Sequence, residues 1–344
     1  MSYLTEESRE AIDDRNLRTM WDVHDQWSSP DTDLEPYLWE WEDIEASLRT
    51  IEEEAPLEDL PQGIRRSLAL RTPGSDITSS TIAAFYQTVT PGEVAGAHRH
   101  NVGAFRFVVE GNDKMYTVVE GEEFPMEPGD LILTPNWTYH DHENQSDETA
   151  VWVDVLDWPF IGSALGAPIF DNHKEFEQPV DKEQGYYNSQ FGTMRPANDN
   201  ASRFRDTPPY RFSWEETYDV LTTAADNDQA YDPYNGVNME YVNPETGQGP
   251  VMSTIALRQQ MLRDGDSTKT HKHNTSEIYY VVKGAGKTEV GDETLEWSEK
   301  DSFVVPPGKW HSHETTADES VLFAMSDRPI FDAFNLYHEE RKDE

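Results

Sequence analysis

The chain has no cysteine among its 344 residues, which excludes disulfide bonds, thiolate metal ligands and cysteine nucleophiles. Long hydrophobic runs are also missing, and the mean hydropathy is −0.78. No segment approaches the roughly 20 apolar residues that a membrane-spanning helix needs. The N-terminal stretch, Met1–Asp14, is polar and acidic, unlike a signal peptide. We therefore expect a cytoplasmic protein that makes no contact with membranes.

Basic residues are few: 27 Lys and Arg stand against 67 Asp and Glu, for a net charge of −40 at pH 7. Such a surface repels nucleic acid and anionic membranes, so neither is an expected partner. The acidic residues are spread through the chain, which argues against a disordered acidic tail. A folded protein from a salt-accumulating microbe fits this pattern, because a short Debye length screens its self-repulsion. An acidic protein from an ordinary cytoplasm is the alternative.

The chain is longer than one hydrophobic core usually spans, which predicts two domains. Composition and periodicity divide it into five segments: a helical segment at 1–63, a β-rich domain at 64–158, a partly ordered linker at 159–246, a second β-rich domain at 247–329 and a closing helical tail at 330–344. The linker is rich in Pro, Asn, Asp and Gly.

Two helices have recognisable signals outside the β-rich domains. Thr5 suits a helix start, and apolar residues recur at helical spacing from Leu38 to Ile51. Within the linker, Ser213 and Glu216 form a capping box, which predicts a helix that begins there.

Short β-like runs, several of them separated by Gly and Pro turns, predict the strands of a barrel or jelly roll. The expected strands are Ser67–Leu70, Thr81–Val89, Phe105–Glu110, Met115–Val119, Leu131–Thr134, Ala150–Val155, Val251–Arg263, Glu277–Val282, Lys287–Val290, Ser302–Val305 and Ser320–Ala324.

A His-x-His motif occurs once in each β-rich domain, and each copy is followed at nearly the same spacing by a third histidine. The N-terminal histidines are His98, His100 and His140; the C-terminal histidines are His271, His273 and His311. This correspondence predicts the duplication of a whole domain. Residues i and i+2 of a strand share one face, so each pair projects together, and a third imidazole completes a metal site suited to Fe, Ni, Cu or Zn.

The two copies differ at the position that follows the histidine pair. The second copy has Glu277 six residues after His271, which gives four candidate ligands, whereas the matching residue of the first copy is Ala104. Three neutral imidazoles leave about three open positions on a six-coordinate ion, enough for a bidentate substrate and dioxygen. The fuller second set either binds a second metal ion or is a structural relic.

Motifs distributed over the first domain and its flanks closely resemble the gentisate 1,2-dioxygenase family. They are Leu38–Trp41, Arg65-Arg66, Pro91–Ala95, His98–His100, Phe105–Phe107, Glu110-Gly111, Pro128–Asp130, Thr134-Pro135, Trp137–His142, Trp152–Asp157 and Asp327–Pro329. The resemblance covers the chain from about Pro36 to Glu340. It implies an all-β-dominated bicupin, in which two jelly-roll β-barrel domains share one chain with N-terminal helices and an irregular linker.

The resemblance also implies an activity. Fe(II) held by the N-terminal histidines would support cleavage of the gentisate (2,5-dihydroxybenzoate) ring by dioxygen, with both oxygen atoms incorporated to give maleylpyruvate. The family further suggests a homotetramer. Salicylate and 1-hydroxy-2-naphthoate are alternative substrates that the metal ligands do not separate. A non-catalytic bicupin for binding or storage is a more distant alternative, and Ala104 speaks against an oxalate-type decarboxylase.

Five pocket residues follow from the motifs. Arg106 would hold the substrate carboxylate by a two-pronged hydrogen bond, and a structural salt bridge is its alternative. His142 would be a hydrogen-bond partner or proton relay, rather than a partly exposed histidine. Gln87 and Asp154 would line the pocket, with Asp154 at the second ring hydroxyl, unless both make structural hydrogen bonds. Arg65 would point to the pocket, and a surface position is its alternative.

Overall fold

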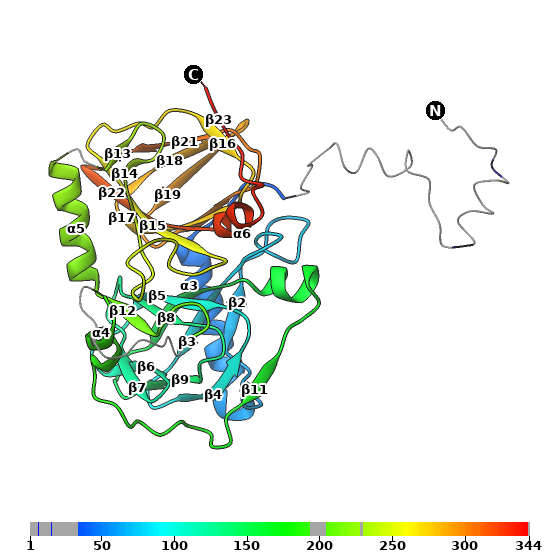
Figure 1. The fold of residues 1–344 in the computed structure, drawn as a ribbon, viewed down its shortest axis with the longest axis vertical. Helices are drawn as coiled ribbons and strands as arrows, with labels where there is room; N and C mark the ends of the chain where they lie inside the picture. The colour runs from blue at the N-terminus through cyan, green and yellow to red at the C-terminus, as the bar shows by residue number, and fades with distance from the viewer. Residues whose placement is uncertain (1–5, 7–14, 16–33, 193–203, 228–229, 343–344) are drawn as a thin grey trace. The chain divides into compact units, whose positions relative to one another are not determined.

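Short antiparallel strands make up most of the regular secondary structure (Figure 1). The computed structural model describes Glu6, Arg15 and residues 34–192, 204–227 and 230–342, so the helix start expected at Thr5 lies outside it. From Leu34 onward the chain forms one compact unit, and its strands form four sheets. Among the described residues, no helix is both long and apolar enough to cross a membrane.

Two of the sheets form the N-terminal cupin, in the orders β12-β8-β5-β10-β3-β2 and β11-β4-β9-β6-β7. Side chains from both sheets, among them Trp152, Phe124 and Met115, pack into one apolar cluster between them. The strands are β2 (Ser67–Ala69), β3 (Ala83–Val89), β4 (Val94–His100), β5 (Ala104–Glu110), β6 (Met115–Val119), β7 (Glu122–Pro125), β8 (Leu131–Thr134), β9 (His140–Asn144), β10 (Ala150–Leu156), β11 (Phe170–Asn172) and β12 (Tyr210–Phe212).

The other two sheets form the C-terminal cupin, in the orders β1-β20-β17-β22-β15-β14-β13 and β19-β18-β21-β16-β23. Its internal cluster includes Tyr279, Trp297 and Phe303. The strands are β1 (Tyr37–Trp39), β13 (Tyr231–Asp232), β14 (Gly236–Glu240), β15 (Ala256–Arg263), β16 (His271–His273), β17 (Glu277–Lys283), β18 (Ala285–Val290), β19 (Glu293–Ser298), β20 (Ser302–Val305), β21 (His311–Thr315), β22 (Glu319–Ser326) and β23 (Glu339–Arg341). The two-barrel architecture predicted from the sequence is confirmed.

The outer faces of two sheets, one from each cupin, pack against each other. The rings of Phe107 on β5 and Phe323 on β22 stack with centroids 4.2 Å apart, within one shared apolar cluster. Because side chains alternate along a strand, Arg106 next to Phe107 points to the opposite face, into the N-terminal barrel. The contact between the two cupins therefore holds β5 in place, and β5 carries Arg106, the residue expected to bind the substrate carboxylate.

Both ends of the described chain complete the C-terminal cupin, contrary to expectation. Leu38 was expected in a helix, but it lies in β1 and pairs with Phe303 of β20; the helix α3 begins afterwards and spans Trp41–Glu54. The tail contains a short helix, α6 (Arg328–Ala333), and then β23, which pairs with β16. Open sheet edges accept additional strands, and this tertiary pairing outweighs local helix propensity.

The expected linker is more regular than its composition indicates. It contains a π-helical turn at Pro159–Ala164 and the helices α4 (Tyr186–Gln190) and α5 (Trp214–Asp226), and a short 3-10 turn at Leu57–Asp59 precedes the first cupin. The predicted cap of α5 is confirmed, since the Ser213 hydroxyl accepts from the Glu216 N–H at 3.3 Å. The linker also contains four strands. Two of them, β11 and β12, extend the N-terminal sheets, whereas β13 and β14 extend a C-terminal sheet.

Candidate metal and substrate site

The N-terminal histidines meet inside the first barrel. His98 and His100 project from β4, and His140, the first residue of β9, is the register partner of His98. Their ring centroids lie 5.4, 4.4 and 5.0 Å apart, and one candidate ligand atom from each lies within 4.8 Å of the others. The rings are 4%, 9% and 1% exposed, so water does not satisfy their nitrogen atoms.

The surroundings leave these imidazoles neutral and fix two of the rings. Burial lowers the pKa of His98 and His140 far below the usual value and that of His100 to about 4. Carbonyl oxygens only accept, so His100 Nδ1 donates to Val102 O at 2.7 Å and His140 Nδ1 to Thr138 O at 3.1 Å. Both rings therefore present an unprotonated Nε2, and that of His140 is buried without a hydrogen-bond partner. This donor set fits a divalent transition metal.

Arg106 lies beside the histidines and is 3% exposed. Its Nε donates to Nε2 of His142 at 3.2 Å, its Nη1 donates to the Thr134 hydroxyl, and Nε lies 3.5 Å from Oδ1 of Asp154. Arg106 thus has an acidic neighbour, Asp154, on the adjacent strand β10. Burial raises the pKa of Asp154, although Arg106 opposes this shift, and Oδ1 has no hydrogen-bond partner.

His142 is buried, with 1% of its surface exposed, which excludes the partly exposed alternative. Its Nε2 accepts from Arg106, so Nδ1 carries the proton and donates to the Thr117 hydroxyl at 3.1 Å. The ring lies 4.6 Å from that of Trp152. His142 is therefore a neutral, oriented imidazole next to the candidate anchor.

Gln87 and Arg65 enter the same barrel from its other edge. Gln87 on β3 is 2% exposed, and its amide nitrogen has no hydrogen-bond partner. Arg65 donates through Nη2 to Gly96 O at 2.9 Å, and this atom lies 2.5 Å from Nδ1 of His98. Burial and Arg106 lower the pKa of Arg65 to about 9, so it remains protonated at neutral pH.

The Arg65-Arg66 pair divides between two environments. Nε and Nη1 of Arg65 are buried without partners, which excludes the surface alternative for this residue. Arg66 instead forms an ion pair with Glu93, the residue just before the strand that carries the histidine pair. Of the two arginines, Arg65 is the one beside the candidate metal ligands.

One neighbour of the metal ligands was missed by sequence reasoning. Phe170 on β11 stacks its ring on His98 at a centroid distance of 4.8 Å, although it lies in the expected linker and is 49% exposed. Its only signal in the sequence is an apolar pair, Ile169-Phe170, within a segment otherwise rich in turn residues.

The C-terminal histidines form a triangle of nearly the same size. Their ring centroids lie 5.7, 4.3 and 5.1 Å apart, and their ligand atoms also lie within 4.8 Å of one another. Glu277 is 4% exposed, and one of its oxygens lies 3.8 Å from Nε2 of His273. Arg258 and Tyr279 both donate to this carboxylate. Burial raises the pKa of Glu277, but Arg258, His273 and the hydrogen bond from Tyr279 together outweigh it and hold this pKa well below the usual range.

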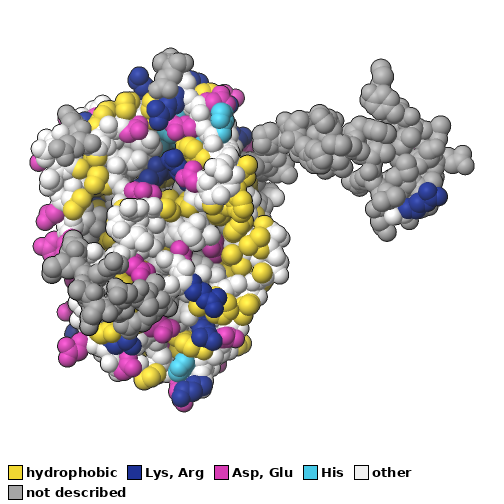
Figure 2. Space-filling view, in the orientation of Figure 1, with side chains coloured by type: hydrophobic (Ala, Val, Ile, Leu, Met, Phe, Trp, Pro, Cys, Tyr) yellow, Lys and Arg dark blue, Asp and Glu magenta, His cyan; other side chains and the backbone are white. Residues whose placement is uncertain are grey.

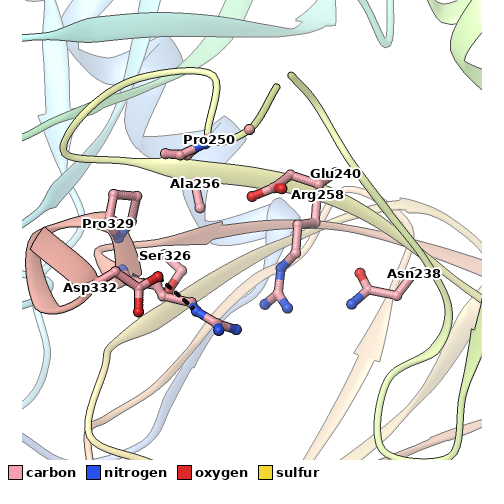
Figure 3. Close-up of a pocket in the computed structure, with 10 residues that line it drawn as sticks. Asn238, Glu240, Pro250, Ala256, Arg258, Ser326, Pro329 and Asp332 are labelled. Carbon is pink, nitrogen blue, oxygen red and sulfur yellow. Dashed lines mark hydrogen bonds and ion pairs between the residues drawn. The ribbon is translucent and has the colours of Figure 1, made fainter. Parts of the chain in front are cut away.

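Arg258 is also part of the wall of a cavity of about 360 Å³ in the C-terminal cupin (Figure 3). Glu240 and Asp332 line the same cavity. Arg258 was not singled out from the sequence. Two glutamines, Gln259 and Gln260, follow it in the sequence, so no apolar run marks it as a buried cation.

Comparisons with known proteins agree with this geometry. A model of the cupin domain matches residues 85–156 and 258–326. A gentisate 1,2-dioxygenase from Haloferax sp is 44% identical over 98% of this chain and 96% of its own length. A 1-hydroxy-2-naphthoate 1,2-dioxygenase from Nocardioides sp. (strain KP7) is 36% identical over 89% of this chain and 78% of its own. The solved salicylate 1,2-dioxygenase of Pseudoaminobacter salicylatoxidans with gentisate has a TM-score of 0.89 and 29% identity, covering 100% of this chain and 96% of that one.

Proposed function

Because this chain belongs to the gentisate 1,2-dioxygenase family, whose members are ring-cleaving dioxygenases, we propose that its N-terminal cupin opens the ring of gentisate with dioxygen to give maleylpyruvate. The observation that carries the proposal is the buried set of three neutral imidazoles beside Arg106, with Ala104 where the second cupin has a carboxylate. This arrangement provides metal ligands, open coordination positions and a cationic anchor in one barrel.

The N-terminal histidines would hold Fe(II). When bound, iron would bring substrate and dioxygen together and let electron density pass from the ring to oxygen. The protein would position the metal ligands, because the three histidines lie on two paired strands. The apolar cluster that contains Trp152 would limit the access of water to the reacting groups.

Arg106 would bind the substrate carboxylate. Its guanidinium is buried and fixed by Thr134 and His142, while Asp154 lies at 3.5 Å with imperfect hydrogen-bond geometry. A planar guanidinium matches a carboxylate by two parallel hydrogen bonds, and burial strengthens this interaction. Asp154 would then accept from the second ring hydroxyl through Oδ1, which has no hydrogen-bond partner in the structure.

The remaining pocket residues would orient the ring and handle protons. His142, whose Nδ1 proton is held by Thr117, would accept through Nε2 from the ring hydroxyl next to the carboxylate. The amide nitrogen of Gln87 is free to donate. Nε and Nη1 of Arg65 have no hydrogen-bond partner, so Arg65 would be able to donate to the bound acid.

The test is reconstitution with Fe(II) in high salt, followed by dioxygen uptake and product absorbance after gentisate is added. We expect one dioxygen consumed per gentisate, and no uptake by His140→Ala. Salicylate and 1-hydroxy-2-naphthoate are assayed beside gentisate, because relatives of this chain carry those names. An iron-loaded protein that binds gentisate but consumes no dioxygen would instead support the non-catalytic binding protein.

We also propose a cytoplasmic homotetramer. The run Trp158–Phe170 has no charged residue in a chain of which 27% is charged. It exposes Trp158, Leu165, Ile169 and Phe170, and Figure 2 shows apolar side chains gathered on one side of the molecule. Apolar patches of this kind mark subunit contacts, and light scattering in high salt would give the mass.

A further inference from the structure

The cavity shown in Figure 3 lies in the C-terminal cupin, and the proposed ring cleavage does not use it. We propose that this cavity binds a small zwitterion, a molecule with a carboxylate at one end and an ammonium group at the other, such as a free amino acid. The proposal does not depend on the substrate of the N-terminal cupin or on a metal ion in either barrel.

The cavity lies between α6 and the inner face of the sheet that contains β14, β15 and β22. Glu240 on β14 is the register partner of Arg258 on β15, and Ala256 on β15 is the partner of Ser326 on β22. Paired residues, and residues two apart in one strand, project to the same face of a sheet. This face is the interior one, because Arg258 contacts Glu277 beside the C-terminal histidines. The lining residues from α6 are Arg328, Pro329 and Asp332.

Two guanidinium groups supply the cationic part of the cavity wall. Arg258 donates through Nη2 to Glu277, and Arg328 donates through Nε to Asp332 at 3.2 Å. Within the described part of the chain, no residue accepts a hydrogen bond from the other guanidinium nitrogens of either arginine. Cζ of Arg328 also lies 3.9 Å from the centroid of the Tyr337 ring, which holds the guanidinium in place. These free nitrogens are the donors that a carboxylate needs.

Glu240 supplies an anionic part of the same wall. Its carboxylate makes no hydrogen bond or ion pair with any residue that the structure describes. Burial raises the pKa of this carboxyl, and the charges of Arg258 and Arg328 oppose the shift. Figure 3 shows Glu240 and Arg258 at the same cavity. An ammonium group would therefore give Glu240 the partner that it lacks.

Polar groups without partners continue from the cavity along the same face of the sheet. Asn238 lines the cavity, and its Oδ1 is buried without a hydrogen-bond partner among the described residues. Gln260, its register partner on β15, is 1% exposed, and neither end of its amide has such a partner. Buried polar groups cost stability unless a ligand or water satisfies them. They favour a polar occupant over an apolar one.

The charges favour a zwitterion over a simple anion or a simple cation. A simple anion would meet the carboxylates of Glu240 and Asp332, and the net charge of −40 opposes its approach. A simple cation would meet two guanidinium groups. A zwitterion satisfies both kinds of wall, and a volume of about 360 Å³, near the lower end for ligand pockets, suits a molecule of amino-acid size.

The experiment is isothermal titration calorimetry of the full-length protein with three probes of similar length: β-alanine, propionate and propylamine. We expect β-alanine to bind with a millimolar or lower Kd, and the other two to bind at least about 10-fold more weakly. Equal binding of propionate or propylamine would overturn the proposal in favour of an anion or a cation site. Absence of β-alanine binding would overturn it in favour of a cavity that holds only water.

Two substitutions test the opposite ends of the site with little risk to folding, because Glu240 is exposed and the side chain of Arg328 is 46% exposed. Glu240→Gln and Arg328→Gln should each weaken β-alanine binding about 10-fold or more. Glu240→Gln should also strengthen propionate binding, since it removes a repelling charge. Glu293→Gln on β19, an exposed glutamate outside the cavity, is the matched control and should bind β-alanine as the wild type does. Unchanged β-alanine binding in both cavity variants would overturn the proposal.

Saturating gentisate, added in the absence of dioxygen, should leave β-alanine binding unchanged, because the ring substrate is assigned to the other barrel. Displacement of β-alanine by gentisate would place both molecules in one site and overturn the proposal. The two cavity variants decide the question whether or not ring cleavage is observed.

Discussion

Thr81, just before β3 of the N-terminal barrel, donates its hydroxyl to the buried carboxylate of Asp327, just after β22 of the C-terminal barrel. The relationship is reciprocal: Thr254 precedes β15 of the C-terminal barrel and donates to Asp157 of the N-terminal one at 2.7 Å. Each aspartate also accepts a backbone N–H from its own domain, Ser276 for Asp327 and Gly103 for Asp157. These two hydrogen bonds therefore link the duplicated domains reciprocally, each domain donating to an aspartate of the other.

Thr81→Val and Thr254→Val should each destabilise the protein by about 1–3 kcal/mol, because each leaves a buried carboxylate without a hydroxyl donor. Urea unfolding in high salt measures the loss. Thr294→Val on β19 is the control, since its hydroxyl bonds the exposed Glu289, and its effect should stay within about 0.5 kcal/mol. Equal effects at all three positions would contradict a special role for the reciprocal pair.

Asp327 should make stability depend on pH. Burial raises its pKa from 3.8 to about 7, so the folded state binds a proton that the unfolded state has released between these values. Its contribution to the free energy of unfolding therefore falls as pH rises from about 4 to about 7, by at most about 4 kcal/mol. Urea unfolding across this range should show the decline in the wild type and a flatter profile in Asp327→Asn. Parallel profiles would refute the assignment.

Arg106→Ala should raise KM for gentisate and lower kcat/KM, while iron content stays unchanged. The fall in kcat/KM should correspond to a loss of transition-state stabilisation of about 2–5 kcal/mol. Arg106→Lys should recover part of this loss, because an ammonium keeps the charge but not the two-pronged geometry. Arg49→Ala, an arginine with a 68% exposed side chain on α3, serves as the control. Normal turnover by Arg106→Ala would leave Arg106 with a structural role only.

Ala104→Glu should convert the first metal site into a copy of the second. The new carboxylate would fill a coordination position that the proposal reserves for substrate or dioxygen, so we expect retained iron and a loss of kcat/KM of about 100-fold or more. Ala104→Gln adds similar bulk without the charge, and a milder loss there would separate coordination from crowding. Full activity of Ala104→Glu would show that three open positions are not required.

Stability should rise with KCl concentration, because a net charge of −40 repels itself until salt screens it. Melting temperatures from low to molar KCl measure the effect. Sucrose at matched osmolality controls for exclusion of cosolute from the surface. A melting temperature that is flat in KCl would favour an acidic protein from an ordinary cytoplasm over a salt-adapted one.

Local patterns predicted what depends on neighbours in the chain. The two-residue period of a strand placed His98 and His100 on one face, and the cap at Ser213 marked the start of α5. Position relative to distant segments was not predictable in this way. Leu38 fits a helical pattern, yet it joins a sheet because β20 offers an open edge some 260 residues later in the chain.

The sequence by itself determined the duplicated barrel, the six histidines and the asymmetry between Ala104 and Glu277, since spacing and residue type are properties of the chain alone. Only the tertiary structure decided which side chain each arginine contacts. Arg106 meets Asp154, Arg258 meets Glu277, and Arg65 rather than Arg66 reaches His98. These pairings depend on strand register and barrel closure, which bring together side chains that no local pattern relates.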